Sequence, residues 1–379
     1  MQNNHKLQVA DKELNLWRYP KQTEDSPLQA WDSADNLLVE KFLEQYPLAD
    51  SGKRKIAILN DQFGAISCQL TDQKPLIYQD SKVSQLATLA NFELNQLDVE
   101  QVEFCNQLSA TDKQSVFLLK IPKSLDYLED ILAHLHQYAP DNLELIAAAK
   151  ANHINKSVVK LFNRYFTQVE ISLAQKKSRT ISASGKQKSP YSSFSQWQTW
   201  TTKTGLIFKN AANVFSRSSL DMGAEFLLQN LPDAQGKDVI DLACGNGVLG
   251  LHLVSQNPNS IIFSDDCFQA IESAQLSFKE NFAEQEIACQ FVWQDCLANQ
   301  NNESADLIIC NPPFHQQHTI TDHIARQMFE DAKRVLRTGG ELHIVGNQHL
   351  GYHQTLSNIF GHSTVVASNN KFVILKAKK

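Results

Sequence analysis

The sequence repeats one pattern twice: short apolar runs alternate with longer segments of helical periodicity. Such runs, separated by segments long enough to contain a helix, are typical of parallel strands joined by crossover connections. The expected strands are 56–60, 75–79, 101–105, 116–121, 143–148 and 168–173 in the first half, and 238–242, 260–264, 289–293, 306–310 and 341–345 in the second. The pattern predicts two consecutive α/β units, each built on a parallel, doubly wound sheet.

The length of the chain also favours two domains, because 379 residues exceed what a single hydrophobic core usually serves. Between the two patterns lies a Ser- and Lys-rich stretch that contains the breakers Gly185 and Pro190. This composition is typical of a mobile linker. We therefore expect domains at 1–175 and 196–379, joined by a basic linker over 176–195.

The carboxyl-terminal segment holds two β-rich runs, 363–367 and 371–376, around Ser368-Asn369-Asn370. This arrangement predicts a hairpin. An antiparallel hairpin that closes an otherwise parallel sheet resembles the seven-stranded sheet of class I methyltransferases, whose last strand is inserted antiparallel to its neighbours.

Near the start of the second domain, Trp197 and Trp200 stand three residues apart, which favours a packed helix face over a base-stacking platform.

The overall composition is that of an ordinary globular protein, with 42% hydrophobic and 20% charged residues. The first 13 residues have no apolar core, so neither a secretory signal nor a membrane anchor is expected, and we predict a cytoplasmic protein. Seven cysteines without a Cys-x-x-Cys pair argue against a disulfide framework and a zinc ribbon. The cluster His315, His318 and His323 lacks cysteine or carboxylate ligands at matching spacing, so no metal site is expected.

The net charge of -6 conceals a segment of opposite sign. Residues 171–220 contain eight Lys or Arg and no Asp or Glu, which leaves 27 basic and 41 acidic residues, a balance of -14, elsewhere in the chain. Positive charge concentrated in this way favours a localised phosphate-binding surface. A solvated basic linker explains the same charges equally well.

A small-residue turn follows the first strand of the second half. Small residues there let the backbone approach a ligand at the carboxyl end of the strand, and a carboxylate at the end of the next strand can accept hydrogen bonds from ribose hydroxyls. Strand alternation directs only one of Asp265 and Asp266 inward, and we assign Asp265. The candidate cofactor-binding residues are Phe215, Asp241, Ala243, Gly245, Asn246, Gly247, Asp265 and Asp295, with Asp295 placed for an adenine amino group and Phe215 in the segment before the first strand.

The candidate catalytic residues are Asn311, Pro312 and Phe314, in the sequence Asn-Pro-Pro-Phe directly after an apolar strand. The lone pair of an amide or aryl amine is delocalised, so such a nitrogen must be reoriented before it attacks a methyl group. The Asn311 side-chain oxygen and the Pro312 carbonyl can each accept one hydrogen bond from the amino group, while Phe314 stacks on the planar substrate. His315 can relay the released proton, although a polar residue flanking a helix explains it as well.

These motifs resemble those of class I methyltransferases. Three longer strings, NVFSRSSLDMG at 213–223, NPPFHQQH at 311–318 and NNKFVILKA at 369–377, are similar to the bacterial guanine-N2 methyltransferases of large-subunit ribosomal RNA, and the resemblance extends over the full length. The sister family acting on small-subunit RNA shares Asn-Pro-Pro-Phe-His but continues with Asp-Gly. The resemblance implies S-adenosylmethionine as the cofactor and a guanine of large-subunit ribosomal RNA as the substrate.

The resemblance also implies an N-terminal domain of the same fold that has lost cofactor binding and serves RNA recognition or stability. Opposite the glycine turn the first half has ILNDQFG at 58–64, and opposite Asn-Pro-Pro-Phe it has IPKS at 121–124. One departure concerns the catalytic half, where Ala243 stands at a position that is usually glycine. Alanine there is unfavourable if the backbone requires positive φ.

Three other functions are compatible with the residues alone. Methylation of small-subunit RNA uses the same chemistry, and so does methylation of a protein glutamine, although relatives with that activity carry Tyr where this chain has Phe314. A scaffold that binds RNA without catalysis would retain the fold but not bind S-adenosylmethionine. The sequence does not determine the oligomeric state, and a monomer is compatible with it.

Overall fold

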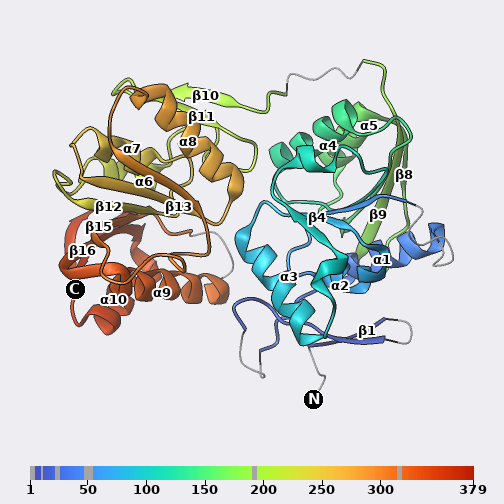
Figure 1. Ribbon diagram of the computed structural model, residues 1–379, viewed down its shortest axis with the longest axis horizontal. Helices are drawn as coiled ribbons and strands as arrows, with labels where there is room; N and C mark the ends of the chain where they lie inside the picture. Colours follow the sequence, from blue (N-terminus) through green and yellow to red (C-terminus); the bar gives the residue numbers. More distant parts are fainter. Residues whose placement is uncertain (1–4, 10–11, 22–25, 47–53, 190–193, 314–317) are drawn as a thin grey trace. The chain divides into compact units, whose positions relative to one another are not determined.

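The computed structural model describes residues 5–9, 12–21, 26–46, 54–189, 194–313 and 318–379. The chain forms two compact units, residues 1–195 and 196–379, and each contains a seven-stranded sheet with helices on both faces (Figure 1). Two tandem domains of Rossmann-like fold are therefore confirmed.

The first unit contains a small hairpin followed by the sheet β5-β4-β3-β6-β7-β9-β8. All strands of this sheet are parallel except β9, which pairs antiparallel with both β7 and β8. Its elements are β1 (Lys6–Val9), β2 (Lys12–Asn15), α1 (Ser33–Gln45), β3 (Ile56–Leu59), α2 (Ala65–Gln69), β4 (Leu76–Tyr78), α3 (Lys82–Leu94), β5 (Glu103–Cys105), β6 (Val116–Lys120), α4 (Leu125–Tyr138), β7 (Glu144–Lys150), α5 (Lys156–Tyr165), β8 (Phe166–Ile171) and β9 (Ser178–Lys186).

The second unit repeats this topology as β14-β13-β12-β15-β16-β18-β17, with β18 antiparallel to both of its neighbours. The carboxyl-terminal hairpin and its antiparallel insertion are confirmed. The elements are β10 (Gln198–Thr201), β11 (Ile207–Asn210), α6 (Met222–Leu228), β12 (Asp238–Leu242), α7 (Val248–Val254), β13 (Ser260–Asp265), α8 (Phe268–Phe282), β14 (Ala288–Trp293), β15 (Ala305–Cys310), α9 (His318–Val335), β16 (Leu336–Asn347), α10 (Tyr352–Phe360), β17 (Thr364–Ser368) and β18 (Phe372–Lys378).

The expected linker over 176–195 is wrong, because residues 178–186 form strand β9, which pairs antiparallel with β7 on one side and with β8 on the other. Serine and lysine suggested a linker, but the alternation of the segment buries Ile181 and Ala183 in the core. Its small polar residues fit the opposite face, where Ser178 lies buried and hydrogen-bonds Ser33 of α1. The first domain therefore includes this strand, and its compact unit ends at residue 195.

The expectation that Trp197 and Trp200 share a helix face is also wrong, since Trp200 lies in strand β10. Its ring stacks on the buried ring of Phe208 in β11, at a centroid distance of 4.8 Å. The β10–β11 hairpin in turn hydrogen-bonds α8, where the Ser277 hydroxyl accepts from the Lys209 amide. Trp200 therefore packs inside the domain, as the sequence interpretation had favoured over base stacking.

The core of the second unit lies on both faces of the sheet. One cluster packs α6, α7 and α8 against one face, and the other packs α9 and α10 against the opposite face. Because β12 and β15 are central and parallel, with Leu242 opposite Cys310, their carboxyl ends open at the same edge. This edge brings the residues after both strands together.

Candidate active site

A tight turn joins β12 to α7 and is built from three residues with positive φ: Ala243 at 56°, Gly245 at 55° and Gly247 at 81°. The two glycines serve different purposes. A Cβ on Gly247 would lie 3.1 Å from Ala274 and 3.2 Å from Phe263, so this glycine permits close packing on α8 and β13. A Cβ on Gly245 would meet no atom within 4 Å, so its backbone borders open space. A ligand can approach the turn at Gly245.

Asp241 lies at the end of β12 with its carboxyl group fully buried under this turn. One oxygen, Oδ2, accepts a hydrogen bond of 2.8 Å from the Gly250 amide, while the buried Oδ1 has no hydrogen-bond partner among the described residues. Burial, and the nearby charge of Asp265, raise the pKa of Asp241 to about 7. A cation bound beside Oδ1 would reverse this shift.

Asp265 ends β13, and its carboxylate is joined directly to the glycine turn. Its Oδ2 accepts from the Gly245 amide at 2.8 Å, and its Oδ1 accepts from the Cys267 amide at 2.9 Å, at the start of α8. An ionised carboxylate is acceptor-only, and each of its oxygens can accept more than one hydrogen bond. The structure thus places Asp265 beside the open part of the turn.

Two other candidates have side chains that connect elements of the domain. The Asn246 amide donates to Asn210 Oδ1 at 2.8 Å and accepts from the Val248 amide at 3.2 Å. Because both ends of its side-chain amide are engaged, any contact of Asn246 with a ligand would come from its backbone. The buried Asp295 carboxylate accepts a hydrogen bond from Gln327 of α9 at 2.9 Å.

Asn311 follows β15 at the same edge of the sheet, and its side-chain amide is held in one orientation. Its Nδ2 donates to Asp221 Oδ2 at 3.3 Å, and the same oxygen caps α6 by accepting from the Ala224 amide at 2.9 Å. The Asn311 Oδ1 is buried and has no hydrogen-bond partner among the described residues. A buried acceptor in this state is costly unless a ligand supplies a donor.

The neighbours of Asn311 are only partly described. Pro312 is buried and Pro313 is exposed. Phe314 and His315 lie outside the described residues, as do the side chain of His318 and therefore most of the histidine cluster.

Asp221 is the residue of the candidate site that the sequence analysis did not identify. Its signal was an acidic residue directly before a helical segment, which is the pattern of an N-cap.

The segment before α6 lies against the start of α8. The Asn213 amide donates to Gln269 Oε1 at 2.7 Å, and Asn213 Nδ2 lies 3.9 Å from Cys267 Sγ, two residues after Asp265. Phe215 follows in this segment with 53% of its surface exposed. Phe215 thus follows, by two residues, the point at which this segment contacts the start of α8.

The first domain keeps the shape of the turn but has lost its chemistry. Asn60 and Gly64 have positive φ, 63° and 77°, at the positions of Ala243 and Gly247. The helix after the turn is now capped from within the turn, because Asp61 Oδ2 accepts from the Ile66 and Ser67 amides. At the position of Asp265 stands Gln79, whose Nε2 donates to the Asp61 carbonyl oxygen at 2.8 Å.

The register of the sheet corrects the comparison made for Asn311. Leu119 pairs with Leu59 as Cys310 pairs with Leu242, so the counterpart of Asn311 is Lys120, one residue before the Ile-Pro-Lys-Ser string. Lys120 forms ion pairs with Asp32 and Asp35. Asp32 caps α1 as Asp221 caps α6, so a lysine and two aspartates replace the asparagine–aspartate pair.

The positive φ of Ala243 leads to a stability prediction. An L-residue with a Cβ is strained in the left-handed region, so Ala243→Gly is expected to raise the free energy of unfolding by about 0.5–1 kcal/mol, after allowing for the greater freedom of glycine in the unfolded chain. Urea unfolding measures this difference. The control Ala270→Gly, inside α8, is expected to lower stability. A loss of stability in Ala243→Gly would contradict the strain argument.

The strand order, the antiparallel last strand and the glycine turn with a carboxylate on the next strand define the second domain as a class I methyltransferase domain. Comparison with known proteins agrees. The RLMG N-terminal domain family matches residues 4–187, and the methyltransferase small domain family matches residues 205–376.

Curated relatives span nearly the whole chain. The ribosomal RNA large subunit methyltransferase G of Pseudoalteromonas atlantica is 43% identical over 98% of this chain and 99% of its own length, and that of Aeromonas salmonicida is 43% identical over the same shares. The chain therefore belongs to the ribosomal RNA large subunit methyltransferase G family, and it is an enzyme. The family resemblance of the sequence motifs is confirmed.

A solved structure shares the complete fold. The T. thermophilus 16S rRNA N2 G1207 methyltransferase RsmC, in complex with AdoMet and guanosine, has a TM-score of 0.77 and 20% identity, covering 100% of this chain and 99% of the other. The tandem arrangement of two similar domains is thus a shared fold. In the described part of the chain, no helix is long and apolar enough to cross a membrane.

Proposed function

We propose that the second domain transfers a methyl group from S-adenosylmethionine to the exocyclic N2 of a guanine in large-subunit ribosomal RNA. The observation that carries this proposal is Asn311, whose amide is oriented by Asp221 so that a buried oxygen, without a partner among the described residues, is left for an incoming N–H. The relatives at 43% identity bear names that give large-subunit ribosomal RNA as their substrate. A bacterial ribosomal RNA substrate implies a cytoplasmic enzyme.

The residues around the turn fit S-adenosylmethionine. Asp265 is a carboxylate beside the open face of Gly245, where it suits the ribose hydroxyls, and Asp241 Oδ1 is a buried acceptor suited to the cationic amino group of the methionine part. Backbone groups of Ala243, Asn246 and Gly247 would line the turn. We assign Asp295 to the adenine side and Phe215 to the methionine side of the cofactor.

The chemistry at Asn311 is electrostatic and geometric. Asn311 Oδ1 accepts one hydrogen bond from the guanine amino group and the Pro312 carbonyl accepts the other, which turns the nitrogen lone pair out of conjugation and towards the methyl donor. Phe314 stacks on the base and keeps it in line. The cofactor supplies a methyl group on a sulfonium, so that a nitrogen–carbon bond forms as the carbon–sulfur bond breaks and its electron pair stays on sulfur.

The target base must leave its stack to reach this edge of the sheet. After methylation the nitrogen carries a positive charge and its proton becomes acidic, so it passes to water without a strong base. Asp221 does not touch the substrate in this scheme. It is a positioning residue that holds the Asn311 amide.

Incubation with radiolabelled S-adenosylmethionine tests the proposal, using large- and small-subunit ribosomal RNA from cells that lack the protein. Label is expected in the large-subunit RNA alone, with N2-methylguanine as the labelled nucleoside in mass spectrometry. Label confined to small-subunit RNA would reject the assigned substrate. Calorimetry is expected to show saturable cofactor binding. Asp265→Ala is expected to weaken this binding about 10-fold or more, because the ribose hydroxyls lose their hydrogen bonds to a charged acceptor. Absence of cofactor binding would reject the enzyme assignment of the site.

A further inference from the structure

The first domain concentrates positive charge in its last third. Residues 145–189 contain nine Lys or Arg and a single acidic residue, Glu170. Three of the cations have carboxylate partners: Lys150 with Asp32, Arg164 with Glu129 and Lys186 with Asp141. Five others, in α5 and around the turn between β8 and β9, form no ion pair with any described residue: Lys156, Lys160, Lys176, Lys177 and Arg179.

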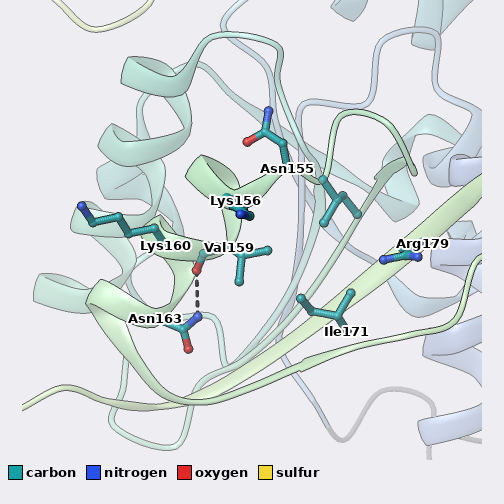
Figure 2. Close-up of a pocket in the computed structure, with 8 residues that line it drawn as sticks. Asn155, Lys156, Val159, Lys160, Asn163, Ile171 and Arg179 are labelled. Atoms are coloured by element: carbon teal, nitrogen blue, oxygen red, sulfur yellow. Dashed lines mark hydrogen bonds between the residues drawn. The ribbon is translucent and has the colours of Figure 1, made fainter.

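Three of these five cations line a surface depression of about 480 Å³ between α5 and the strands β8 and β9. Figure 2 shows α5 on one side of this depression and Ile171 with Arg179 on the other. The lining contains no carboxylate, and it consists of Ile154, Asn155, Lys156, Val159, Lys160, Asn163, Ile171 and Arg179. A volume of this size accommodates a nucleotide unit.

The charged groups of the depression are all cationic donors, while Asn163 donates from its Nδ2 to the Val159 carbonyl oxygen at 2.9 Å. Arg179 is half-buried, and its Nε is a buried atom without a hydrogen-bond partner among the described residues. Asn155 caps α5 with its Oδ1, which accepts from the Ser157 and Val158 amides, so that its Nδ2 faces away from the helix. Lys156 occupies the first turn of this 10-residue helix, where the helix dipole also favours an anion.

Apolar side chains complete the lining. Val159 of α5 and Ile171 of β8 contribute to it, and Ile171 keeps 39% of its surface exposed. Two residues beyond, Leu173 is 85% exposed. Cationic donors beside an exposed apolar surface suit a phosphodiester together with the ribose or base next to it.

We propose that this depression binds a phosphodiester group of the ribosomal RNA substrate, with its neighbouring nucleoside against Val159 and Ile171. The site rests on the proposed function, because it is a subsite for the same RNA, remote in sequence from Asn311. A polyanion fits better than a free nucleotide since the unpaired charge continues outside the depression to Lys176 and Lys177. The site then adds affinity and orientation for the RNA without participating in methyl transfer.

The test compares two triple variants of the full chain, Lys156→Ala/Lys160→Ala/Arg179→Ala and the control Lys55→Ala/Lys74→Ala/Lys113→Ala, whose three lysines are exposed elsewhere in the first domain. Affinity for large-subunit ribosomal RNA is measured over a range of salt concentrations. The first variant is expected to bind about 10-fold or more weakly, and its slope of log K against log salt is expected to fall by about 2, at roughly 0.7 per lost phosphate contact. Cofactor affinity is expected to be unchanged.

Identical RNA affinity and salt slope in the two triple variants would overturn the proposed subsite. So would a result in which guanosine monophosphate binding, but not RNA binding, depends on the three residues. The proposed function fails separately, if the wild-type chain binds RNA and the cofactor but transfers no methyl group to it. In that case the binding comparison still decides whether the depression holds RNA.

Discussion

Asn311→Ala is expected to lower kcat by about 10²- to 10³-fold while S-adenosylmethionine binds as in the wild type, because the substitution removes one of two acceptors aligned for the reacting amino group. Truncation of a preorganised hydrogen-bond partner of the transition state typically costs this much. Single-turnover methylation of large-subunit RNA and calorimetric cofactor titration measure the two quantities. If turnover survived, the role assigned to Asn311 would be wrong.

A matched substitution at Asp221 separates positioning from folding. Asp221→Asn retains an oxygen that can cap α6 at the Ala224 amide, yet it removes the charge that fixes Asn311 Nδ2. We expect a smaller loss in kcat, about 10-fold, with little change in stability or in KM for RNA. An unchanged kcat would show that the Asn311 amide does not depend on Asp221 for its orientation.

The sequence predicted the second domain well because its signals are local. Apolar runs defined the strands, and the turn from Asp241 to Gly247 together with the residues after β15 indicated which edge of the sheet bears the site. The role of Asp221 could not be predicted, since its contact with Asn311 spans 90 residues and depends on how α6 packs over the sheet. The sequence predicted strain at Ala243 only if the backbone there has positive φ, and its φ of 56° satisfies that condition.

The first domain was harder to predict, because there composition and structure disagree. Residues 178–186 have the serine and lysine content of a linker, and only their alternation, with Ile181 and Ala183 inward, indicates a strand. The comparison with Asn311 failed by one residue because a proline was aligned with a proline. Strand register, which is a tertiary property, identifies Lys120 instead.

Lys120 shows how the first domain differs from the second at the position of Asn311. A lysine with 18% of its side chain exposed occupies the place of Asn311, and its charge meets Asp32 and the buried Asp35. Burial alone would lower the pKa of Lys120, but the two carboxylates outweigh it and the pKa is raised. Burial raises the pKa of Asp35 despite the lysine. At this position the first domain therefore has an internal ion pair where the second has an amide.

Lys120→Met is therefore expected to destabilise the first domain by about 3 kcal/mol, because removal of one partner leaves Asp35 buried without its cation. Lys123→Met, three residues further on and outside the cluster, is the control and is expected to change stability by less than about 0.5 kcal/mol. Urea unfolding, monitored by hydrogen exchange of the β3 and β6 amides, measures the stability of the first domain. Cofactor titration measures the binding affinity of the second.

Adding Asp35→Asn to Lys120→Met is expected to restore much of the lost stability, since the amide removes the buried charge while its oxygen still accepts from the Asp32 amide in the capping box. A double variant as unstable as Lys120→Met would attribute the loss to packing of the lysine stem and not to charge. Cofactor affinity is expected to stay unchanged in all three variants. If it fell together with the stability of the first domain, cofactor binding by the second domain would depend on the folding of the first.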